Sequence, residues 1–350
     1  PKGVMITHAN LSHYVQAIRP VLGIGVDDCY LHTASFAFSS SVRQLAVPLS
    51  CGARMVIAPT EAIRNPEALF GLIKAEGVSI VDIVPSYWRI CQLVLAGLEP
   101  APRIELLTNR LRLMLSASEP LLTNVARDWR AAFGNGVQLI NMFGQTETAG
   151  IVTVHQVSSF DGDAASIVPI GRPIANTQAY VLDSAGQPVP IGAWGELHIG
   201  GAGVGRGYLN EPALTAERFV PDPFSRLPGA RLYRTGDITR YLPNGDLVFS
   251  GRVDHQIKLR GYRIEPGQVE AAIGRHPGWR ESAVVVQADA TGDRRLVAYV
   301  VPNSDGGSST RDLREFLKQG LPDYMVPSRF VPVAVLPRTP NGKLDRTALG

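Results

Sequence analysis

Two differently patterned parts of the chain are joined by the stretch Gly251-Arg-Val-Asp-His-Gln-Ile-Lys-Leu-Arg-Gly-Tyr-Arg-Ile-Glu265. Before it, strand and helix patterns alternate over a large α/β body. After it comes a compact segment that ends in Pro340-Asn-Gly-Lys-Leu-Asp-Arg346. The stretch combines a strand pattern with cationic side chains, namely Arg252, Lys258, Arg260, Arg263 and, when protonated, His255. This much positive charge at a joint predicts an anionic ligand in the cleft between the two parts.

The composition narrows the class of protein. The chain has 350 residues, 45% of them hydrophobic, which is enough for more than one core. The net charge is only +3 and no block of like charge occurs, so we expect no nucleic-acid partner. We expect no membrane partner either, because no apolar run reaches the roughly 18 residues of a membrane span. The chain opens on Pro1 without a methionine or a signal peptide pattern, and we interpret it as a piece of a longer protein.

The cysteines favour a reducing compartment. The three of them, Cys29, Cys51 and Cys91, stand singly among apolar or small residues. An odd, unpaired set is typical of buried thiols rather than of disulfides or a metal site, and we therefore expect a cytoplasmic protein.

The N-terminal body repeats strand and helix patterns. Asn65-Pro66 places a capping side chain before a proline at the first helical position, and Gly77 ends that helix. A later helix is expected from Thr123 to Gly134, and strands are expected at 78–84, 111–115 and 137–142. This order predicts a parallel sheet whose ligands bind beyond the carboxyl ends of the strands, which places the loop 143–148 at a site.

Beyond about residue 165 the pattern changes to short alternating strands between turn signals. Asn244-Gly245 lies between two such strands and predicts a hairpin in a barrel-like β layer. We interpret the glycine-rich run 200–207 as a tight crossing or a hairpin in this layer rather than a phosphate loop. We therefore predict an αβ-layered core over 1–254, with a β-rich subdomain at about 165–250, and a self-contained α+β module over 255–350.

Three polar clusters suggest chemistry. Glu147, in the expected site loop beside Thr146, could hold Mg²⁺, although a helix-capping carboxylate is a fair alternative. Asp237 follows a turn glycine and could accept hydrogen bonds from two hydroxyls, although alone it is more often a turn residue. Lys343 sits in the turn Asn341-Gly-Lys, which alone indicates only a solvated lysine.

Taken together, the motifs resemble an adenylation domain of non-ribosomal peptide synthetases, in the superfamily that also contains acyl-CoA ligases and luciferases. The matching segments run in the family's order over nearly the whole chain: Pro1-Lys-Gly-Val, Asn141-Met-Phe-Gly-Gln-Thr-Glu147, Gly195-Glu-Leu-His-Ile-Gly-Gly201, Gly205-Arg-Gly-Tyr-Leu-Asn210, Tyr233-Arg-Thr-Gly-Asp237, Gly251-Arg-Val-Asp254, Arg260-Gly-Tyr-Arg-Ile-Glu265 and Asn341-Gly-Lys-Leu-Asp-Arg346. Each segment is weak evidence alone, and their common order makes the match specific.

The resemblance implies ATP-dependent activation of a carboxylic acid. The carboxylate attacks the α-phosphorus of Mg-ATP, and the phosphopantetheine thiol of a peptidyl carrier protein then takes the acyl group. Catalytic roles are implied for Lys343, Lys258, Glu147 and Thr146, with Glu147 as the metal ligand. Nucleotide contacts are implied for Lys2, Asn141, Phe143, Gly144, Asp237 and Arg252, with Phe143 stacked on adenine and Asp237 on the ribose hydroxyls.

The same resemblance makes 255–350 a C-terminal lid domain and Asp254 its hinge between two catalytic poses. In the first pose Lys343 enters the site and bridges the attacking carboxylate and the α-phosphate or ribose. In the second pose Lys258 and Arg260-Gly261 face the site. One C-terminal module thus serves two half-reactions, which accounts for two separate lysines.

The acyl pocket departs from the family pattern. Ser39 stands where α-amino-acid enzymes carry an aspartate that pairs with the substrate ammonium, and a hydroxyl cannot neutralise a buried ammonium. We therefore expect an acid without the α-amine (aryl, keto or hydroxy), or one whose displaced amine reaches Asp82. An ion pair between Arg43 and Asp82 is an equally weighted alternative to ligand contact. The implied pocket residues are Phe38, Ser39, Ser40, Arg43, Asp82, Leu115, Ala117, Met142, Gly150 and Ile151.

Two other functions remain open. Pro266 after Ile-Glu is similar to the CoA ligase branch of the superfamily, whereas Asn341-Gly-Lys-Leu-Asp-Arg346 and Leu214-Thr-Ala-Glu-Arg-Phe219 favour a domain of a multidomain synthetase. A non-catalytic binding or scaffold module is the third possibility, and retention of Glu147, Asp237 and Lys343 argues against it.

Overall fold

The computed structural model describes residues 2–158, 167–253, 256–288, 294–303, 309–338 and 344–349. The chain divides into two compact units, Pro1–Val253 and Asp254–Gly350. Cys29, Cys51 and Cys91 are free and buried, as expected. Within the described ranges, no helix has both the length and the apolar character needed to cross a bilayer.

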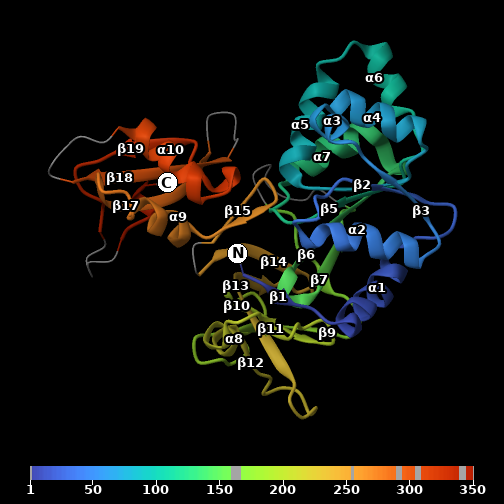
Figure 1. Ribbon diagram of the computed structural model, residues 1–350. Helices are drawn as coiled ribbons and strands as arrows, with labels where there is room; N and C mark the ends of the chain where they lie inside the picture. The colour runs from blue at the N-terminus through green and yellow to red at the C-terminus, as the bar shows by residue number, and fades with distance from the viewer. Residues whose placement is uncertain are drawn as a thin grey trace. The chain divides into compact units, whose positions relative to one another are not determined.

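The N-terminal unit is built on a seven-stranded sheet (Figure 1). Its strands follow the order β3 (Arg54–Ile57), β2 (Cys29–His32), β4 (Ile80–Ile83), β5 (Leu113–Ser116), β6 (Gln138–Gln145), β7 (Gly150–Gln156) and β8 (Arg172–Pro173). The pairs from β3 to β6 are parallel, as predicted, whereas β7 and β8 pair antiparallel. The carboxyl ends of the parallel strands therefore share one edge.

Helices cover both faces of this sheet (Figure 1). One face packs against α1 (His8–Leu22) and α2 (Ser39–Ser50), which enclose a core that contains Tyr14, Tyr30 and Leu115. The other face carries α3 (Thr60–Arg64), α4 (Pro66–Ala75), α5 (Pro85–Ala96), α6 (Pro100–Leu107) and α7 (Thr123–Phe133). Here Trp88 and Trp129 meet edge to face, with ring centroids 4.9 Å apart.

Local signals placed two of these helices correctly. The Asn65 side chain accepts hydrogen bonds from the backbone N–H groups of Glu67 and Ala68, which caps α4 as predicted. α7 begins at Thr123 and ends at Phe133, followed by a short 3-10 turn, η1 (Gly134–Gly136).

The prediction of a loop at 143–148 was wrong in part, because β6 continues to Gln145. The chain then makes a 3-10 turn, η2 (Thr146–Thr148), and returns at once as β7. The return strand pairs Gln145 with Gly150, after a register shift between Phe143 and Gly144. An antiparallel partner that close in sequence extends a strand beyond what its apolar pattern indicates.

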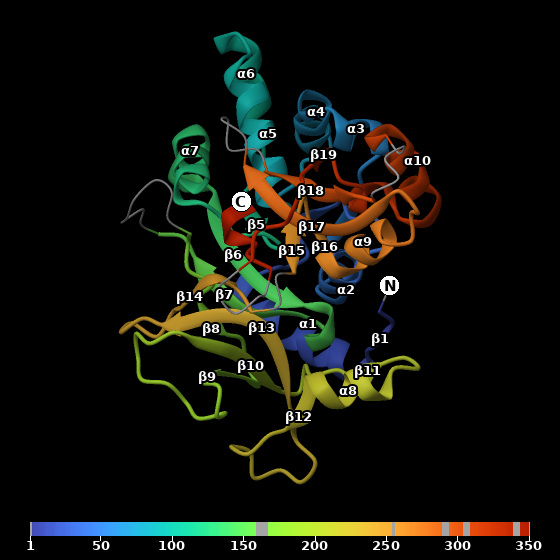
Figure 2. The ribbon, with the colours of Figure 1, turned by 90° about the vertical axis from the view of Figure 1, so that its left-hand side faces the viewer.

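A second, five-stranded sheet forms the β-rich part of the unit (Figure 2). Its path runs β12 (Phe219–Pro221), β13 (Arg231–Tyr241), β10 (Gly195–Gly201) and β9 (Thr177–Leu182), with β14 (Leu247–Arg252) also paired to β13. The hairpin at Asn244-Gly245 is confirmed, since Leu242 donates a backbone hydrogen bond to Asp246 at 2.8 Å. Phe143 and Val152 pack against Leu197, Ile199 and Leu247, which joins the two sheets through one core.

The glycine-rich run crosses between layers and does not open a helix, as the sequence indicated. It leads from β10 into β11 (Gly207–Tyr208), which pairs antiparallel with β1 (Val4–Met5). The helix α8 (Pro212–Arg218) follows only after β11 has ended. Along the crossing, the backbone N–H of Gly205 donates to the carbonyl of Glu147 at 2.9 Å.

The C-terminal unit is an α+β module. The hairpin β15 (Ile257–Leu259) and β16 (Tyr262–Ile264) precedes α9 (Pro266–Ile273). A three-stranded sheet follows, in the order β17 (Trp279–Ala288), β18 (Arg294–Pro302) and β19 (Arg329–Pro332), with α10 (Thr310–Gly320) before β19. α9, α10 and the hairpin share one core with the sheet, while the segment around Leu336 and Leu349 belongs to a second cluster. The short turns are η3 (Asp323–Met325) and η4 (Thr347–Leu349).

Two glycine substitutions should have opposite effects on stability. A Cβ on Gly144 would lie 2.0 Å from the carbonyl oxygen of Gly150, so Gly144→Ala must separate β6 from β7. We expect a loss of about 3 kcal/mol of unfolding free energy. Gly274 has φ −63° and ψ −14°, and its Cβ would meet nothing closer than 3.5 Å, so Gly274→Ala should stabilise by about 0.5 kcal/mol. Thermal unfolding of both variants checks this, and a neutral Gly144→Ala would contradict the packing described.

Candidate active site

Predicted phosphate and acyl residues meet at the carboxyl edge of the sheet. The hydroxyl of Ser39, at the start of α2, lies 2.9 Å from the hydroxyl of Thr146 in η2. Ser39 is exposed, and Ser40 and Phe38 beside it are half-buried. The structure therefore brings a residue expected at the acyl group next to one expected at a phosphate.

Glu147 is held in a buried carboxylate position. It is 1% exposed, and its Oε1 accepts a hydrogen bond from the hydroxyl of Tyr208 at 2.8 Å. Burial raises the pKa of Tyr208 well above its ordinary value, and the nearby charge of Glu147 raises it further, so the phenol stays a proton donor. Lys2 reaches the same place, with its Nζ 6.0 Å from the centre of the Tyr208 ring.

Asp237 and Arg252 form a buried ion pair on neighbouring strands. They lie opposite each other in β13 and β14, and Arg252 Nη1 donates to Asp237 Oδ1 at 2.6 Å. Arg252 Nη2 donates to the carbonyl of Thr235, whose hydroxyl accepts from the backbone N–H of Asp237. The two side chains are 1% and 7% exposed, so the Asp237 carboxylate is held in one orientation.

Asn141 and Phe143 both have packing contacts in β6. The amide nitrogen of Asn141 donates to the carbonyls of Pro169 at 2.9 Å and Val168 at 3.3 Å, which ties β6 to the segment before β8. Phe143 is 7% exposed and lies in the core between the two sheets. Neighbouring Gly144 is required by the close approach of Gly150.

Arg43 and Asp82 form an ion pair, which was one of the two readings left open by the sequence. Arg43 Nε and Nη2 lie 2.8 and 2.7 Å from Asp82 Oδ2, and the Tyr30 hydroxyl donates to the same oxygen at 3.2 Å. Gln44 donates to the Asp82 carbonyl at 2.9 Å. Burial lowers the pKa of Arg43, but the charge of Asp82, the neighbouring Tyr14 and Tyr30 and the hydrogen bond to Asp82 together raise it by more, so the net shift is upward. The Arg43 guanidinium therefore stays charged.

The apolar residues expected in the acyl pocket share one core. This core lies between the sheet and the helices α1 and α2, and the Tyr14 hydroxyl is buried within it with no hydrogen-bond partner among the described residues. Gly150, with φ +123°, would place a Cβ 3.6 Å from the Tyr14 ring. The core contains Leu115, Ala117, Met142 and Ile151.

Sequence reasoning missed the tyrosines of the site. Tyr208 lies in a glycine-rich motif, and only the pairing of β11 with β1 brings it near Glu147. Tyr14 and Tyr30 follow apolar patterns that indicate core positions, which they occupy. The only sequence signal for these residues was a tyrosine on an otherwise apolar face. A buried tyrosine hydroxyl usually has a hydrogen-bond partner, so such a position indicates a polar contact inside the core.

The remaining predicted residues belong to the C-terminal unit or to undescribed stretches. Lys258 lies in β15 opposite Arg263 in β16, and Arg260 has φ +51° in the turn between them. Lys343 and the expected hinge Asp254 lie outside the described residues.

Family comparisons agree with the sequence motifs. A model described as AMP-binding enzyme matches residues 1–209, and one described as AMP-binding enzyme C-terminal domain matches residues 268–343. The chain therefore belongs to the AMP-binding enzyme family.

Similar proteins include a peptide synthase and solved adenylation domains. The dimodular nonribosomal peptide synthase of Bacillus subtilis is 43% identical over 350 residues, which are 100% of this chain and 14% of the synthase. The adenylation domain AlmE of Vibrio cholerae, solved in complex with glycyl-adenosine-5'-phosphate, gives a TM-score of 0.85 at 28% identity, over 100% of this chain and 63% of AlmE. NpsA-ThdA, an artificially fused adenylation–PCP di-domain from Klebsiella oxytoca, gives 0.79 at 28% identity, over 94% and 58%. The resemblance to adenylation domains and the αβ-layered fold are thereby confirmed.

Removing one partner of the Arg43–Asp82 pair should destabilise this region strongly. Asp82→Ala leaves a buried guanidinium without its partner and should cost about 3 kcal/mol or more. A double Arg43→Met, Asp82→Leu variant should lose clearly less, because no buried charge remains. Glu315→Ala, which breaks the exposed pair with Lys318, serves as the control and should change stability by less than about 1 kcal/mol. Urea unfolding measures all three, and an Asp82→Ala effect no larger than the control would contradict the buried pair.

Proposed function

We propose that the chain activates a carboxylic acid as an acyl-adenylate and then passes the acyl group to a phosphopantetheine thiol on a carrier protein. Membership of the AMP-binding family supports this, as do relatives that are peptide synthases and an adenylation–PCP di-domain. The observation that carries the proposal is the cluster at the sheet edge, in which the Ser39 and Thr146 hydroxyls and the buried Glu147 come together.

The first half-reaction is an attack of carboxylate oxygen on the α-phosphorus of ATP. A bond forms between that oxygen and phosphorus, the bond to the bridging oxygen breaks, and pyrophosphate leaves with its electron pair. Negative charge gathers on oxygens around phosphorus, so fixed donors and cations there have the largest leverage on rate. We assign Thr146 and Lys2 to the phosphates and Lys343 to the attacking carboxylate and the α-phosphate or ribose.

The nucleoside is proposed to bind through the second sheet. The Asp237 carboxylate, fixed by Arg252, suits two vicinal ribose hydroxyls, because a carboxylate offers several acceptor sites. We place the adenine beside β6, where Asn141, Phe143 and Gly144 lie. Because Phe143 is 7% exposed, only a small part of its ring is accessible for that contact.

Mg²⁺ fits this site as a partner of the nucleotide. Among the described residues, no group of three or more His, Cys, Asp and Glu side chains could hold a metal alone. Mg²⁺ commonly uses one or two carboxylates together with phosphate oxygens, which is what Glu147 and a bound triphosphate would supply. The bound ion would neutralise charge on the phosphates.

The second half-reaction is proposed to use the other lysine. A thiolate forms a bond to the acyl carbon, and AMP departs with the former carboxylate oxygen. We propose that a turn at Asp254 brings Lys258 and Arg260-Gly261 to the site for this step. The strand β15 and its turn, with Arg260 at φ +51°, present these residues on a short hairpin.

The acyl pocket favours an acid without the α-amine. Ser39 is hydrogen-bonded to Thr146 and offers no charge. Asp82, the one carboxylate among the predicted pocket residues, is already neutralised by Arg43. An ammonium would meet no unpaired carboxylate there, so a keto, hydroxy or aryl acid fits better than one with a displaced amine.

Lys343→Ala separates the two half-reactions. It should lower acid-dependent pyrophosphate exchange by about 100-fold or more, the scale of removing one fixed charge-stabilising donor. Thioester formation from preformed acyl-adenylate should stay within twofold of wild type. Lys318→Ala, at an exposed lysine on α10, is the control and should affect neither assay. Equal losses in both assays would contradict the assignment of Lys343 to the first half-reaction alone.

A substrate panel tests the acyl pocket. Keto, hydroxy or aryl acids should support pyrophosphate exchange at least about tenfold faster than α-amino acids with the same side chain, since each tenfold is only about 1.4 kcal/mol. Ser39→Asp should narrow that ratio by adding the missing carboxylate. Fast, selective use of a standard α-amino acid by the wild type would refute this substrate class without touching the adenylation chemistry.

A further inference from the structure

Asp237, the carboxylate proposed to bind the ribose, lies in an irregular stretch of β13. The register of β13 against β10 shifts at this point, so that residues 235–237 of β13 lie opposite a single residue of β10, Leu197 (Figure 2). A bulge of this kind interrupts the ladder and re-aims a side chain. The backbone groups of the 235–237 bulge therefore need hydrogen-bond partners other than the regular strand pairing.

The Thr235 hydroxyl supplies two of these hydrogen bonds. It donates to the carbonyl of Leu197 at 2.8 Å and accepts from the backbone N–H of Asp237 at 2.9 Å. Thr235 is 1% exposed, so both bonds lie in the protein interior, where losing either would leave a buried group unsatisfied. One side chain thus connects the backbone of Asp237 to β10.

Glu196 of β10 supplies another hydrogen bond, to the residue before Asp237. Its Oε1 accepts the backbone N–H of Gly236 at 3.3 Å, and its Oε2 accepts Arg234 Nη2 at 3.0 Å. Gly236 has φ +75°, a left-handed conformation that glycine adopts readily. The Glu196 side chain is 14% exposed, whereas that of Arg234 is 42% exposed, so solvent weakens the ion pair. The bond to Gly236 is therefore the contact through which Glu196 holds the bulge.

The opposite side of the 235–237 bulge is held by β14. Arg252 donates to the Asp237 carboxylate and to the carbonyl of Thr235. The backbone N–H of Val253 donates to the carbonyl of Gly236 at 2.9 Å. The bulge is thus fixed from β14 on one side and from β10 on the other.

We infer that Glu196 and Thr235 are positioning residues for Asp237 in the recognition of the ribose. This inference rests on the proposed function, which assigns the ribose hydroxyls to Asp237. Two vicinal hydroxyls bind well only to a carboxylate whose position is set before the nucleotide arrives. Loosening the β10 side of the bulge should therefore weaken the distinction between ribose and deoxyribose.

Pyrophosphate exchange with ATP and with 2′-deoxy-ATP tests the inference. The wild-type chain should prefer ATP in kcat/KM by roughly 10-fold or more, the scale of one hydrogen bond to a charged group. Glu196→Gln keeps the size of the side chain but offers one acceptor oxygen to two donors, and should lower this preference to about threefold. Its KM for ATP should rise about fivefold with kcat within twofold, because the ribose contacts are made in the ground state and the transition state alike.

Variants of Thr235 give a second, independent measurement. Thr235→Val removes the hydroxyl and should lower the preference for ATP as Glu196→Gln does, whereas Thr235→Ser keeps the hydroxyl and should retain the preference. In an Asp237→Ala background, Glu196→Gln should reduce the preference no further, because the residue it positions is gone. The preference is a ratio for one enzyme preparation, so a smaller folded fraction does not change it.

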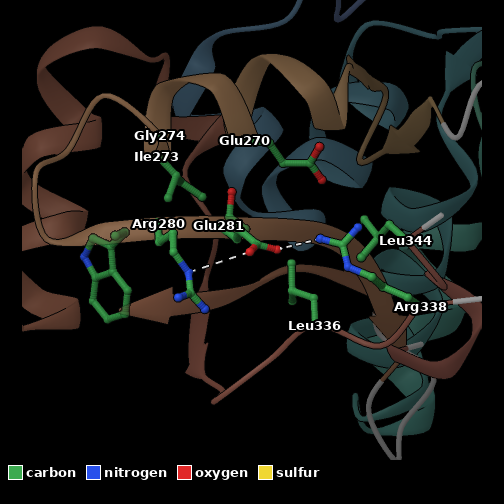
Figure 3. Close-up of a pocket in the computed structure, with 10 residues that line it drawn as sticks. Glu270, Ile273, Gly274, Arg280, Glu281, Leu336, Arg338 and Leu344 are labelled. Carbon is green, nitrogen blue, oxygen red and sulfur yellow. Dashed lines mark hydrogen bonds and ion pairs between the residues drawn. The ribbon is translucent and has the colours of Figure 1, made fainter. Parts of the chain in front are cut away.

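Glu270 of the C-terminal unit provides a matched control. Its Oε1 and Oε2 lie 2.6 and 2.9 Å from Arg346 Nη1 and Nη2, and Oε1 also accepts the backbone N–H of Val284 at 2.7 Å. It lines a cavity of about 270 Å³ (Figure 3) and is 18% exposed. Like Glu196 it joins an arginine to a backbone N–H, but neither of these partners is a predicted nucleotide residue. Glu270→Gln should therefore leave the preference for ATP unchanged.

The outcomes separate this inference from the proposed function. A wild-type preference that persists in Glu196→Gln and Thr235→Val, or one that falls equally in Glu270→Gln, would overturn the positioning role alone. A wild-type chain that uses 2′-deoxy-ATP as well as ATP would contradict the ribose assignment of Asp237 and the inference with it. A chain without acid-dependent exchange would overturn the proposed function as a whole.

Discussion

The buried carboxylate of Glu147 constrains how the β1–β11 ribbon packs on the turn between β6 and β7. A carboxylate that is 1% exposed needs hydrogen-bond donors, and Tyr208 supplies one at 2.8 Å. Satisfying it requires the ribbon of β1 and β11 to close over the turn between β6 and β7. The glycine-rich crossing makes that closure possible, since a Cβ on Gly205 would lie 3.1 Å from the Glu147 carbonyl and one on Gly203 would lie 3.0 Å from that of Thr148. The turn between β6 and β7 therefore contacts both the β1–β11 ribbon and the glycine-rich crossing from β10.

Three charged residues described above are each held by an oppositely charged partner. Arg43 pairs with Asp82, and under the proposed acyl-pocket assignment this leaves no unpaired carboxylate among the pocket residues for an ammonium. Arg252 orients Asp237 and leaves a fixed acceptor for hydroxyls. In the C-terminal unit, Glu270 and Arg346 fix backbone rather than ligand. Buried pairs of this kind define geometry more reliably than they add net stability.

Local signals carried the sequence predictions that succeeded. The Asn65 cap, the helix start at Thr123 and the Asn244-Gly245 turn depend on residues a few positions apart, and the structure has all three. The extension of β6 to Gln145 was missed, because the return strand and not the apolar pattern decides it. The contact of Tyr208 with Glu147 and that of Arg346 with Glu270 span 61 and 76 residues, which no local pattern encodes. The motifs indicated the candidate site residues, whereas their long-range hydrogen-bond partners are visible only in the fold.

The most direct test of the account follows one oxygen atom. An acid labelled with ¹⁸O in its carboxylate is supplied with ATP, Mg²⁺ and a holo carrier protein, and the AMP is analysed by mass spectrometry. Attack of the carboxylate on the α-phosphorus, followed by thiol attack on the acyl carbon, predicts one ¹⁸O atom in each AMP formed. Unlabelled AMP, or label recovered in phosphate or pyrophosphate instead, would contradict the proposed acyl-adenylate.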